Sequence, residues 1–306
     1  MICNPDLMRA AIVVTDPQDW TAQALLGSFA RKGMDPIFLN FSSLSAAISN
    51  SSSSRFKCAG VDLLDLDALI VRDMGKSGAN DVSLRIEALQ ALMDSGVPVI
   101  NPPKAIARAA NKFATSLALQ NAGVPTPNTF VTTSFREAKT ALQDFGKAVS
   151  KPLFGFKGKD IILLERGIEA DLSRLEGIIR TEGLVYLQEF IHLDSPRDIR
   201  AFVVDGRVQG AIYRNAPAGQ WISNLARGGR PTACPLSAEL EDLAGRAAKA
   251  IGAIYCGVDL LETPQGLCVI EVNGTPSGKG IFEALGVDVT EAIAEHVHQN
   301  CYLRGR

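Results

Sequence analysis

The feature that most constrains the fold is the rhythm of the first hundred residues, where short β-rich apolar runs alternate with helical patterns. The apolar runs are Ala10 to Thr15, Pro36 to Asn40, Ala68 to Arg72 and Pro98 to Asn101, and two helical patterns end at Gly33 and Gly96. This alternation predicts an open α/β sheet. The first turn, Thr15 to Asp19, lacks the glycines that a dinucleotide pyrophosphate needs, so we do not expect a Rossmann cofactor site.

A change of pattern near residue 101 indicates further domains. The sequence Asn-Pro-Pro that begins at Asn101 breaks the rhythm, and a helix is expected next, from about Lys104 to Asn121. From Phe130 the order becomes strand, helix, strand, loop, strand and helix, with Ser134 and Glu137 spaced as a capping box, which indicates a small α+β lobe. We predict three parts: an N-terminal open α/β domain over residues 1–100, a central lobe over 101–185 and a C-terminal lobe over 186–306.

The C-terminal lobe shows clear strand signals. The runs Ile199 to Val204 and Arg207 to Tyr213 flank the turn Asp205–Gly206 and predict a hairpin. Two more strands are expected, from Tyr255 to Glu262 and from Leu267 to Asn273. They place the polar residues discussed below on neighbouring strands.

The composition narrows the range of partners. The chain has 306 residues, 46% hydrophobic and 21% charged, which is ordinary for a globular protein. A net charge of -2, from 31 basic and 33 acidic residues, gives no basis for nucleic acid or an anionic membrane as a partner. No apolar stretch is long enough to span a membrane and no signal peptide is evident, so we expect a cytoplasmic protein. The serine-rich segment from Ser42 to Ser54 predicts a mobile surface loop.

The strongest chemical signal lies on the last two predicted strands. Asp259 lies in GVDLLE, and Glu271 and Asn273 lie in VIEVNGTPSG, where oxygen donors stand among apolar residues. Residues two apart on a strand share a face, and a hairpin partner can bring Asp259 opposite them. Magnesium prefers such oxygen ligands. Asp259 taken alone is more typical of a polar strand end, so the prediction of a metal site depends on the three together.

Two other segments carry groups suited to anions. The stretch KPLFGFKGKD, from Lys151 to Asp160, is a strand end that leads into a loop with Gly155, Gly158 and three lysines. Amides and ammonium groups of such a loop can cover phosphates, although a solvated turn has the same composition. Arg200, Arg214 and the arginines of WISNLARGGR suit carboxylate and phosphate oxygens, although each alone is also typical of a surface.

Together these segments resemble the ATP-grasp superfamily, specifically its RimK-like glutamate ligases. The matching motifs are NKFATSLALQNAGVPTP, KPLFGFKGKDI, QEFI, DIRAFVVDGRV, NLARGG, GVDLLE and VIEVNGTP. Their order, spacing and residue types agree over roughly residues 95 to 290. The resemblance implies an ATP-grasp fold, in which an N-terminal open α/β (pre-ATP-grasp) domain precedes two lobes that enclose ATP.

The resemblance also implies roles for individual residues. The nucleotide would meet Lys112, Lys151, Gly155, Lys157 and Gly158 at its phosphates, Gln188, Glu189, Phe190 and Ile191 at adenine, and Asp198 at the ribose hydroxyls. Facing the phosphates and the acyl group would be Arg200, Arg214 and Asn224, with Arg214 and Arg227 stabilising the oxyanion. The ligands of two magnesium ions, for which manganese is an expected substitute, would be Asp259, Glu271 and Asn273.

The implied activity is ATP-dependent ligation of a carboxylate to an amine through an acyl phosphate. We expect the amine of L-glutamate and a cofactor acceptor such as tetrahydromethanopterin or F420. A protein C-terminus, as for RimK, or a LysW-type carrier protein is the alternative acceptor. A small-molecule kinase is the rival enzyme, and a regulatory protein with a degenerate site is the non-enzymatic rival. Relatives commonly form dimers or tetramers, so a homo-oligomer is expected.

Overall fold

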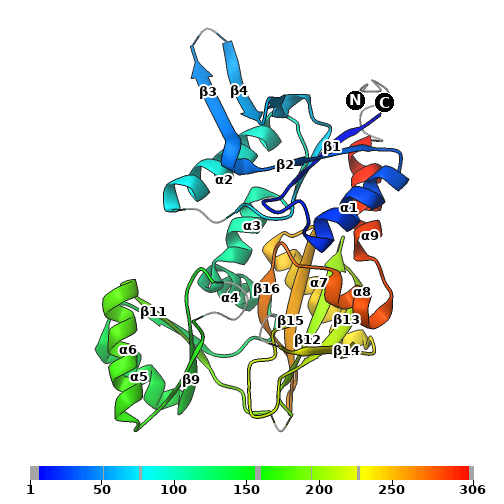
Figure 1. Cartoon of the computed structure of the whole chain (residues 1–306). Coiled ribbons are helices and arrows are strands. Elements are labelled where there is room, and N and C mark those ends of the chain that lie inside the picture. Colours follow the sequence, from blue (N-terminus) through cyan, green and yellow to red (C-terminus); the bar gives the residue numbers. More distant parts are fainter. Residues whose placement is uncertain are drawn as a thin grey trace.

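The structure, a computed structural model, describes residues 7–50, 52–75, 78–155, 160–193, 195–225 and 228–302. Within these ranges a parallel sheet and a small ribbon form one end of the molecule, and two antiparallel sheets form the other (Figure 1). This mixture confirms the predicted α/β and α+β class. No helix in the described part of the chain is long and apolar enough to cross a lipid bilayer.

The N-terminal domain is built on a parallel sheet in the order β2-β1-β6-β7. Its main elements are β1 (Arg9–Val13), α1 (Trp20–Arg31), β2 (Asp35–Leu39), β6 (Ala68–Val71), α2 (Ala79–Asp94) and β7 (Val99–Ile100). All of β6 is buried, as expected of a parallel strand that is covered on both faces. Helix α1 begins directly after the first turn because the Asp19 carboxylate accepts the Ala22 N–H at 3.0 Å.

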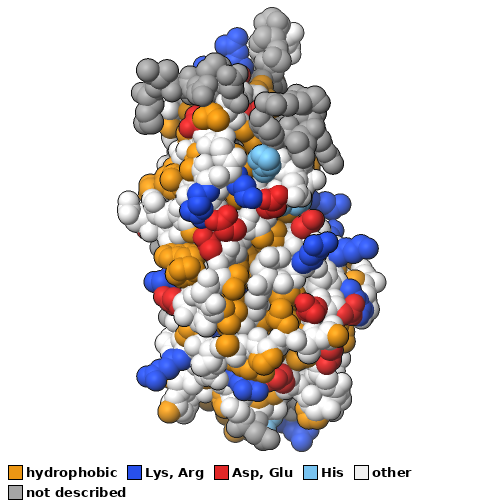
Figure 2. Space-filling view, turned by 90° about the vertical axis from the view of Figure 1, so that its right-hand side faces the viewer, with side chains coloured by type: hydrophobic (Ala, Val, Ile, Leu, Met, Phe, Trp, Pro, Cys, Tyr) orange, Lys and Arg blue, Asp and Glu red, His pale blue; other side chains and the backbone are white. Residues whose placement is uncertain are grey.

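The two faces of this sheet are covered by helices from different parts of the chain. Ala11 and Leu69 share an apolar core with α2, whereas Ile12 and Ile70 share one with α1 and α9 (Val289–Val297). Helix α9 thus returns from the far end of the chain to pack against α1, in a core that also includes side chains of the C-terminal sheet described below (Figure 1). Acidic and basic side chains lie side by side on the outer surface at this side of the molecule (Figure 2). They include the ion pairs that join α1 to α9.

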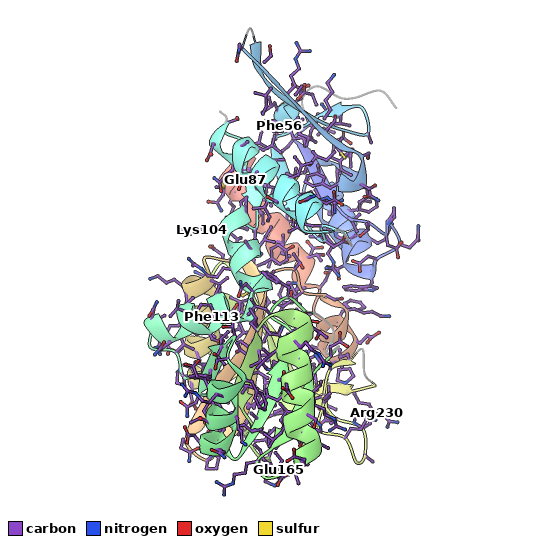
Figure 3. The ribbon with its side chains drawn as sticks, turned by 90° about the vertical axis from the view of Figure 1, so that its left-hand side faces the viewer. Phe56, Glu87, Lys104, Phe113, Glu165 and Arg230 are labelled. Carbon is purple, nitrogen blue, oxygen red and sulfur yellow. The ribbon has the colours of Figure 1, made fainter. Side chains whose placement is uncertain are left out.

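The serine-rich segment is not the loop that we expected. β3 (Leu44–Ser49) and β4 (Ser52–Cys58) pair as an antiparallel ribbon, to which β5 (Val61–Asp62) adds. Phe56 is buried at the base of the ribbon, whereas Ile48 is 89% exposed (Figure 3). The prediction was wrong because a ladder of backbone hydrogen bonds that starts on a buried base can continue into a polar stretch without apolar side chains.

The helix expected from about Lys104 to Asn121 is divided into α3 (Pro103–Ala110) and α4 (Lys112–Asn121). Asn111 between them has an extended backbone, and its side chain accepts the Ala114 N–H at 3.1 Å. The prediction of one helix was wrong because apolar periodicity does not reveal that an asparagine caps a new helix. The Lys112 N–H donates to the Leu153 carbonyl at 3.1 Å, so the break brings Lys112 beside the loop after β9.

The central sheet is antiparallel, in the order β10-β9-β11-β8. Its elements are β8 (Thr129–Thr132), α5 (Phe135–Phe145), β9 (Lys147–Lys151), β10 (Ile162–Glu165), α6 (Glu169–Glu182) and β11 (Val185–Glu189). The two helices share one apolar core with the sheet. The Ser134 hydroxyl accepts the Glu137 N–H as the capping box predicted, but the Glu137 carboxylate accepts from the Thr132 hydroxyl instead of returning to Ser134.

The C-terminal sheet is also antiparallel, in the order β14-β13-β12-β15-β16. Its elements are β12 (Arg197–Val204), β13 (Arg207–Asn215), β14 (Arg230–Ala233), α7 (Ala238–Ile251), β15 (Tyr255–Thr263) and β16 (Gly266–Asn273), followed by α8 (Lys279–Leu285). The predicted hairpin at Asp205–Gly206 is confirmed, and both turn residues have the positive φ that such a turn requires. Helix α7 packs on one face of the sheet.

The three-part division by residue number stays a prediction, and two observations bear on it. Strand β11 begins at Val185 and lies in the central sheet, so the expected boundary at 185/186 falls inside this strand. Helix α9 lies beyond residue 186 in sequence, yet it packs against α1 of the N-terminal domain as well as against β12 and β13 of the C-terminal sheet. The cysteines among the described residues are free thiols.

Candidate functional site

One face of the C-terminal sheet carries most of the predicted site residues. The register pairs Asp198 with Arg214, Arg200 with Asp259, and Asp259 with Glu271, so these side chains share a face. Farther along β12 the same face becomes apolar at Phe202, which joins the N-terminal core. The opposite face is apolar under α7. The charged groups therefore form one patch on a sheet that is otherwise packed.

Within this patch the charges alternate in sign. The Arg214 guanidinium donates from Nε to Asp198 at 2.5 Å and lies 2.8 Å from Asp259 through NH2. Arg200 also bonds both Asp259 oxygens, one of them at 2.8 Å. Burial alone would raise the pKa of the Asp259 carboxyl, but the Arg200 and Arg214 charges lower it to about 2. Asp259 is therefore ionised at neutral pH.

A loop between β13 and β14 closes over the buried end of this patch. The Ser223 hydroxyl donates to Asp198 at 2.7 Å, and the Gly229 N–H donates back to the Asn224 carbonyl at 3.3 Å. The turn is so tight that a Cβ at Gly229 would lie 2.0 Å from the Ser223 carbonyl oxygen. Within the described residues no group hydrogen-bonds the Asn224 side-chain amide. Arg227 lies outside the described residues.

Two lysines reach the patch from other elements. Lys112, at the start of α4, donates to Glu271 Oε1 and to the Gly155 carbonyl, each at 3.1 Å. Lys151, at the end of β9, donates to the side-chain oxygen of Gln188 at 2.6 Å. Burial lowers the pKa of the Lys151 ammonium, while the nearby Glu271 carboxylate opposes this shift. A cation that is desolvated and hydrogen-bonded to a neutral amide is well suited to an anionic ligand.

The loop after β9 is described only in part. A Cβ at Gly155 would lie 2.6 Å from Pro152 Cγ, so the chain passes here at a distance that only glycine permits. This close approach leaves the Gly155 carbonyl beside Lys112. Lys157 and Gly158, which were predicted at the phosphates, lie outside the described residues.

The segment predicted to meet adenine is held firmly at the end of β11. The Glu189 N–H donates to the Asn128 carbonyl at 2.8 Å, and its carboxylate accepts from the Asn128 amide at 2.7 Å. The Phe190 N–H donates to the Lys147 carbonyl, and its ring meets Trp221 edge-on with centroids 5.7 Å apart. A π-face from the loop between β13 and β14 therefore stands beside this segment. Contact of Glu189 and Ile191 with adenine stays a prediction.

The predicted metal ligands are brought together as the hairpin geometry required. Asp259 stands directly across from Glu271, and Asn273 lies two residues farther along β16. Their oxygen donors, two carboxylates and one amide, fit a magnesium ion. Among the described residues there is no group of three His, Cys, Asp or Glu side chains that could hold a metal ion. Asp259 and Glu271 are both paired to cations, so a metal ion would share or replace these partners.

Several residues at the site were missed from the sequence. Ser223 holds Asp198, and the Tyr186 hydroxyl, which lies 2.8 Å from Ser116 Oγ, accepts from the Gln188 amide at 3.3 Å. Arg72 reaches the segment after Asn273 from the N-terminal sheet. The one available signal for Arg72 was its place directly after the apolar strand ALIV, where charged groups gather at the carboxyl end of a parallel sheet.

The chain is similar to a known family and to known sequences. Residues 109–297 match the family model described as a RimK-like ATP-grasp domain. The chain is 41% identical to tetrahydromethanopterin:alpha-L-glutamate ligase of Methanosarcina acetivorans, over 95% of this chain and 99% of that protein. It is 32% identical to a Shewanella denitrificans protein named probable alpha-L-glutamate ligase 1, over 96% of this chain and 98% of that protein.

A solved structure shares the fold. The ATP-grasp ligase PsnB, complexed with a phosphomimetic variant of a minimal precursor, Mg and ADP, matches with a TM-score of 0.74. The match covers 96% of this chain and 99% of that chain at 20% sequence identity, so it shows a similarity of fold only.

Proposed function

This chain belongs to the RimK-like ATP-grasp family, and from that premise we propose that it adds L-glutamate to the carboxylate of tetrahydromethanopterin or a closely similar cofactor. The acceptor and the amino acid come from the name of the Methanosarcina acetivorans relative, which aligns with nearly the whole chain. The family activity is ATP-dependent ligation of an acid to an amine. The cytoplasmic location and the homo-oligomer stay predictions.

The observation that carries the proposal is the meeting of two desolvated lysines with a row of carboxylates and arginines. Lys112 and Lys151 come from different elements and end at the charged face that contains Asp259 and Glu271. We propose that both ammonium groups bind the nucleotide phosphates. If the Lys112 ammonium moved from Glu271 to a nucleotide phosphate, the Glu271 carboxylate would become free to bind a metal ion. The ion pairs of this structure are therefore compatible with a site that holds ATP and a metal ion.

ATP-grasp ligases use ATP and Mg²⁺, and the donor set fits this requirement. Asp259, Glu271 and Asn273 would hold the metal, and the low pKa of Asp259 keeps it a ready ligand at neutral pH. A divalent ion in this place would neutralise charge on the phosphate oxygens. Two ions, and substitution of Mn²⁺ for Mg²⁺, are proposals for this chain.

The chemistry proposed for the acceptor has two steps. The acceptor carboxylate attacks the terminal phosphorus of ATP, ADP leaves, and an acyl phosphate remains. The uncharged amine of glutamate then attacks the acyl carbon and the C–N bond forms. Inorganic phosphate leaves with the C–O bond electrons, and it takes up overall the proton that the nitrogen loses. The protein needs no nucleophile of its own, because positioning and charge stabilisation account for both steps.

The contacts favour different tasks for the residues that we predicted at the acyl group. Asn224 is half-buried, and its amide has no hydrogen-bond partner within the described residues, so we propose that it contacts the substrates. Arg214 is 4% exposed and bonded to two carboxylates. We therefore propose that Arg214 acts mainly by holding Asp198 and Asp259. Direct contact of Arg227 with the oxyanion stays a prediction.

The test is ADP release by purified protein with ATP, Mg²⁺ and L-glutamate, against a panel of pterin, deazaflavin and peptide acceptors. We expect release that needs both acceptor and glutamate, with a product that mass spectrometry finds heavier by one glutamyl residue. Glu271→Gln should abolish release, whereas Glu262→Gln, a change of an exposed carboxylate paired with Arg197 on the same sheet, should not. ADP formed without glutamate, together with a stable phosphorylated acceptor, would instead establish the small-molecule kinase.

If only a peptide acceptor gives a product, the function would be the alternative one, ligation of glutamate to a protein C-terminus. The Shewanella denitrificans relative is compatible with this alternative, because its name specifies glutamate but no acceptor. In that case the ATP and metal site would be retained and only the acceptor would change.

A further inference from the structure

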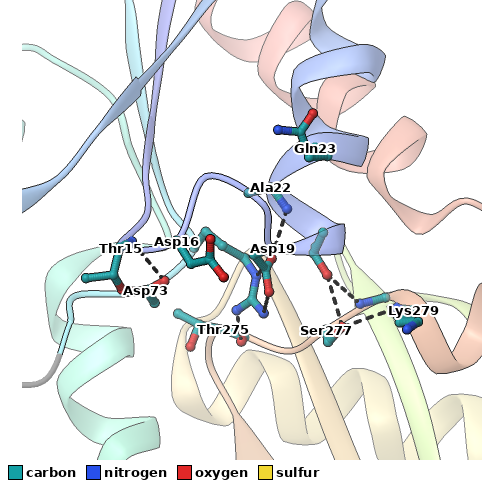
Figure 4. Close-up of polar contacts among 12 residues, drawn as sticks. Thr15, Asp16, Asp19, Ala22, Gln23, Asp73, Thr275, Ser277 and Lys279 are labelled. Carbon is teal, nitrogen blue, oxygen red and sulfur yellow. Dashed lines mark hydrogen bonds and ion pairs between the residues drawn. The ribbon is translucent and has the colours of Figure 1, made fainter.

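Arg72 links the N-terminal domain to the segment that follows the candidate metal ligands. Its partners Asp19 and Thr275 lie on neighbouring segments in Figure 4. Its guanidinium donates NH1 to the Thr275 carbonyl at 2.9 Å. Its other face is bidentate on the Asp19 carboxylate, with Nε at 2.9 Å and NH2 at 3.1 Å. Asp19 is itself fixed by the Ala22 N–H at the start of α1. Arg72 is only 12% exposed and is held in one orientation by these contacts.

Neighbouring points of the same segment are also tied to the N-terminal domain. The fully buried Asn101 amide donates to the Gly274 carbonyl at 2.7 Å and to the Tyr255 carbonyl at 2.6 Å. The Thr21 hydroxyl accepts the Gly278 N–H at 3.2 Å. The stretch after β16 is therefore anchored at Gly274, Thr275 and Gly278 by side chains that lie on α1 or directly after strands of the N-terminal sheet.

The contact made by Arg72 leads directly to a metal ligand. The Thr275 N–H donates to the side-chain oxygen of Asn273 at 2.9 Å. That oxygen is the atom of Asn273 that would bind a divalent cation, and it keeps a second lone pair for this purpose. The Thr275 peptide segment thus has its N–H on the ligand and its carbonyl on Arg72. A shift of this segment would rotate the Asn273 amide.

We propose that Arg72 is a positioning residue for the divalent-cation site, and that Asp19 holds it in place. The inference rests on the proposed function, in which Asn273 is a metal ligand. Residues that orient a ligand without touching the metal often change metal affinity by about 10- to 100-fold when they are mutated. The carboxyl edge of the N-terminal sheet thereby controls how well the C-terminal sheet binds its metal.

A purely structural role for Arg72 makes a different prediction. Arg108, on α3, also reaches from outside the C-terminal sheet, where its NH1 donates to the Ala250 carbonyl at 2.9 Å and the Ile251 carbonyl at 3.2 Å. It ties α3 to the end of α7, and neither of the carbonyls that it bonds belongs to the segment after β16. If Arg72 merely joined two parts of the molecule, loss of Arg108 should have the same consequences for metal binding.

The experiment measures Mn²⁺ binding to the full-length protein in the presence of ADP, by the loss of the free-ion electron paramagnetic resonance signal. Arg72→Lys keeps the charge and loses the fork, and Asp19→Asn keeps a helix-capping oxygen and loses the charge that holds Arg72. We expect both variants to bind Mn²⁺ at least about tenfold more weakly than wild type. Arg108→Met, a larger chemical change, should stay within about twofold.

A second readout separates positioning from general damage. ADP affinity without metal should change by less than about twofold in both variants, because Lys112 and Lys151 do not contact Arg72. Wild-type affinity for Mn²⁺ in both variants, or an equal loss in Arg108→Met, would overturn the role assigned to Arg72. Failure of the wild-type protein to bind either Mn²⁺ or, in competition with it, Mg²⁺ in the presence of ADP would overturn the proposed metal site on which this role rests.

Discussion

The two large sheets at opposite ends of the chain treat charge differently. The N-terminal parallel sheet has an apolar core on both faces, and its charged groups stand at the strand ends: Arg9 and Asp35 begin β1 and β2, and Arg72 and Asp73 follow β6. The C-terminal antiparallel sheet has an apolar core under α7, but its other face carries Asp198, Arg214 and Asp259 within the strands. The charged groups therefore lie at the strand ends of the first sheet and on one face of the second sheet.

The difference shows what each architecture allows. A parallel sheet is reached through crossover helices that cover both faces, so polar side chains are left to the strand ends. An antiparallel sheet joined by hairpins can keep one face for polar groups. On this face the cost of desolvating each charge is offset by neighbours of opposite sign, as Arg214 shows between its two carboxylates.

The largest effect should come from breaking that alternation. Arg214→Met leaves Asp198 and Asp259 without a shared partner in a buried place, and we expect a loss of about 3–5 kcal/mol in the free energy of unfolding. Urea unfolding at neutral pH measures it. Arg230→Met, at an exposed position on β14, is the matched control and should cost less than about 0.5 kcal/mol. Equal losses in the two variants would contradict the comparison.

A core substitution tests whether α9 and α1 are stabilised as one unit. Ile293 is fully buried in the core that contains Ile12 and Phe29, so Ile293→Ala should cost about 3 kcal/mol through lost burial and a cavity. Native-state hydrogen exchange should show faster opening of α1 than of α7. The converse substitution, Ile251→Ala, should affect α7 more. Loss of protection in α7 and α1 together would mean that the two cores open as one unit.

A lysine on the charged face should matter for activity more than for folding. Lys151→Met removes a proposed phosphate ligand, and we expect glutamate-dependent ADP release to fall about a hundredfold or more. Because burial already lowers the pKa of Lys151, its loss removes an unfavourably desolvated cation, and stability should change by less than about 1 kcal/mol. Activity assays and urea unfolding on the same preparation measure both quantities. A large loss of stability with normal activity per folded molecule would reverse this assignment.

The smallest effect is expected at the exposed ion pairs between α1 and α9. Arg31 is 57% exposed where it meets Glu291 and Asp288, so its interactions are screened by water and salt. Arg31→Met should cost about 0.5 kcal/mol or less at low salt, and the difference from wild type should vanish in concentrated sodium chloride. Thermal unfolding at two salt concentrations measures it. A loss of stability comparable to that of Arg214→Met would remove the distinction between exposed and buried ion pairs.

Prediction from the sequence succeeded where a short-range rule was enough. The two-residue period of a strand put Glu271 and Asn273 on one side, and the hairpin signal put Asp259 across from them. The resemblance to the ATP-grasp superfamily, carried by motifs in a fixed order, is confirmed by the family match over residues 109–297. Capping residues such as Ser134 were found for the same reason, because the bond that they make spans three residues.

Prediction failed where distant segments decide the outcome. The break at Asn111 depends on a bridge to Phe154, and no pattern inside the helix announces it. The ribbon from Leu44 onward depends on its pairing with the strand that contains Phe56. The packing of α9 against α1 joins residues that lie more than half the chain apart.

The sequence by itself determined the strands, their faces and the residue types that the chemistry needs, because these follow from local periodicity and from side-chain chemistry. Only the tertiary structure decided which charges neutralise one another and which segment orients a ligand. Arg214 between Asp198 and Asp259, and Arg72 on the Thr275 carbonyl, are long-range hydrogen-bonded contacts. The physical reason is that desolvation makes each buried charge depend on its neighbours in space, and those neighbours are set by how the sheets pack.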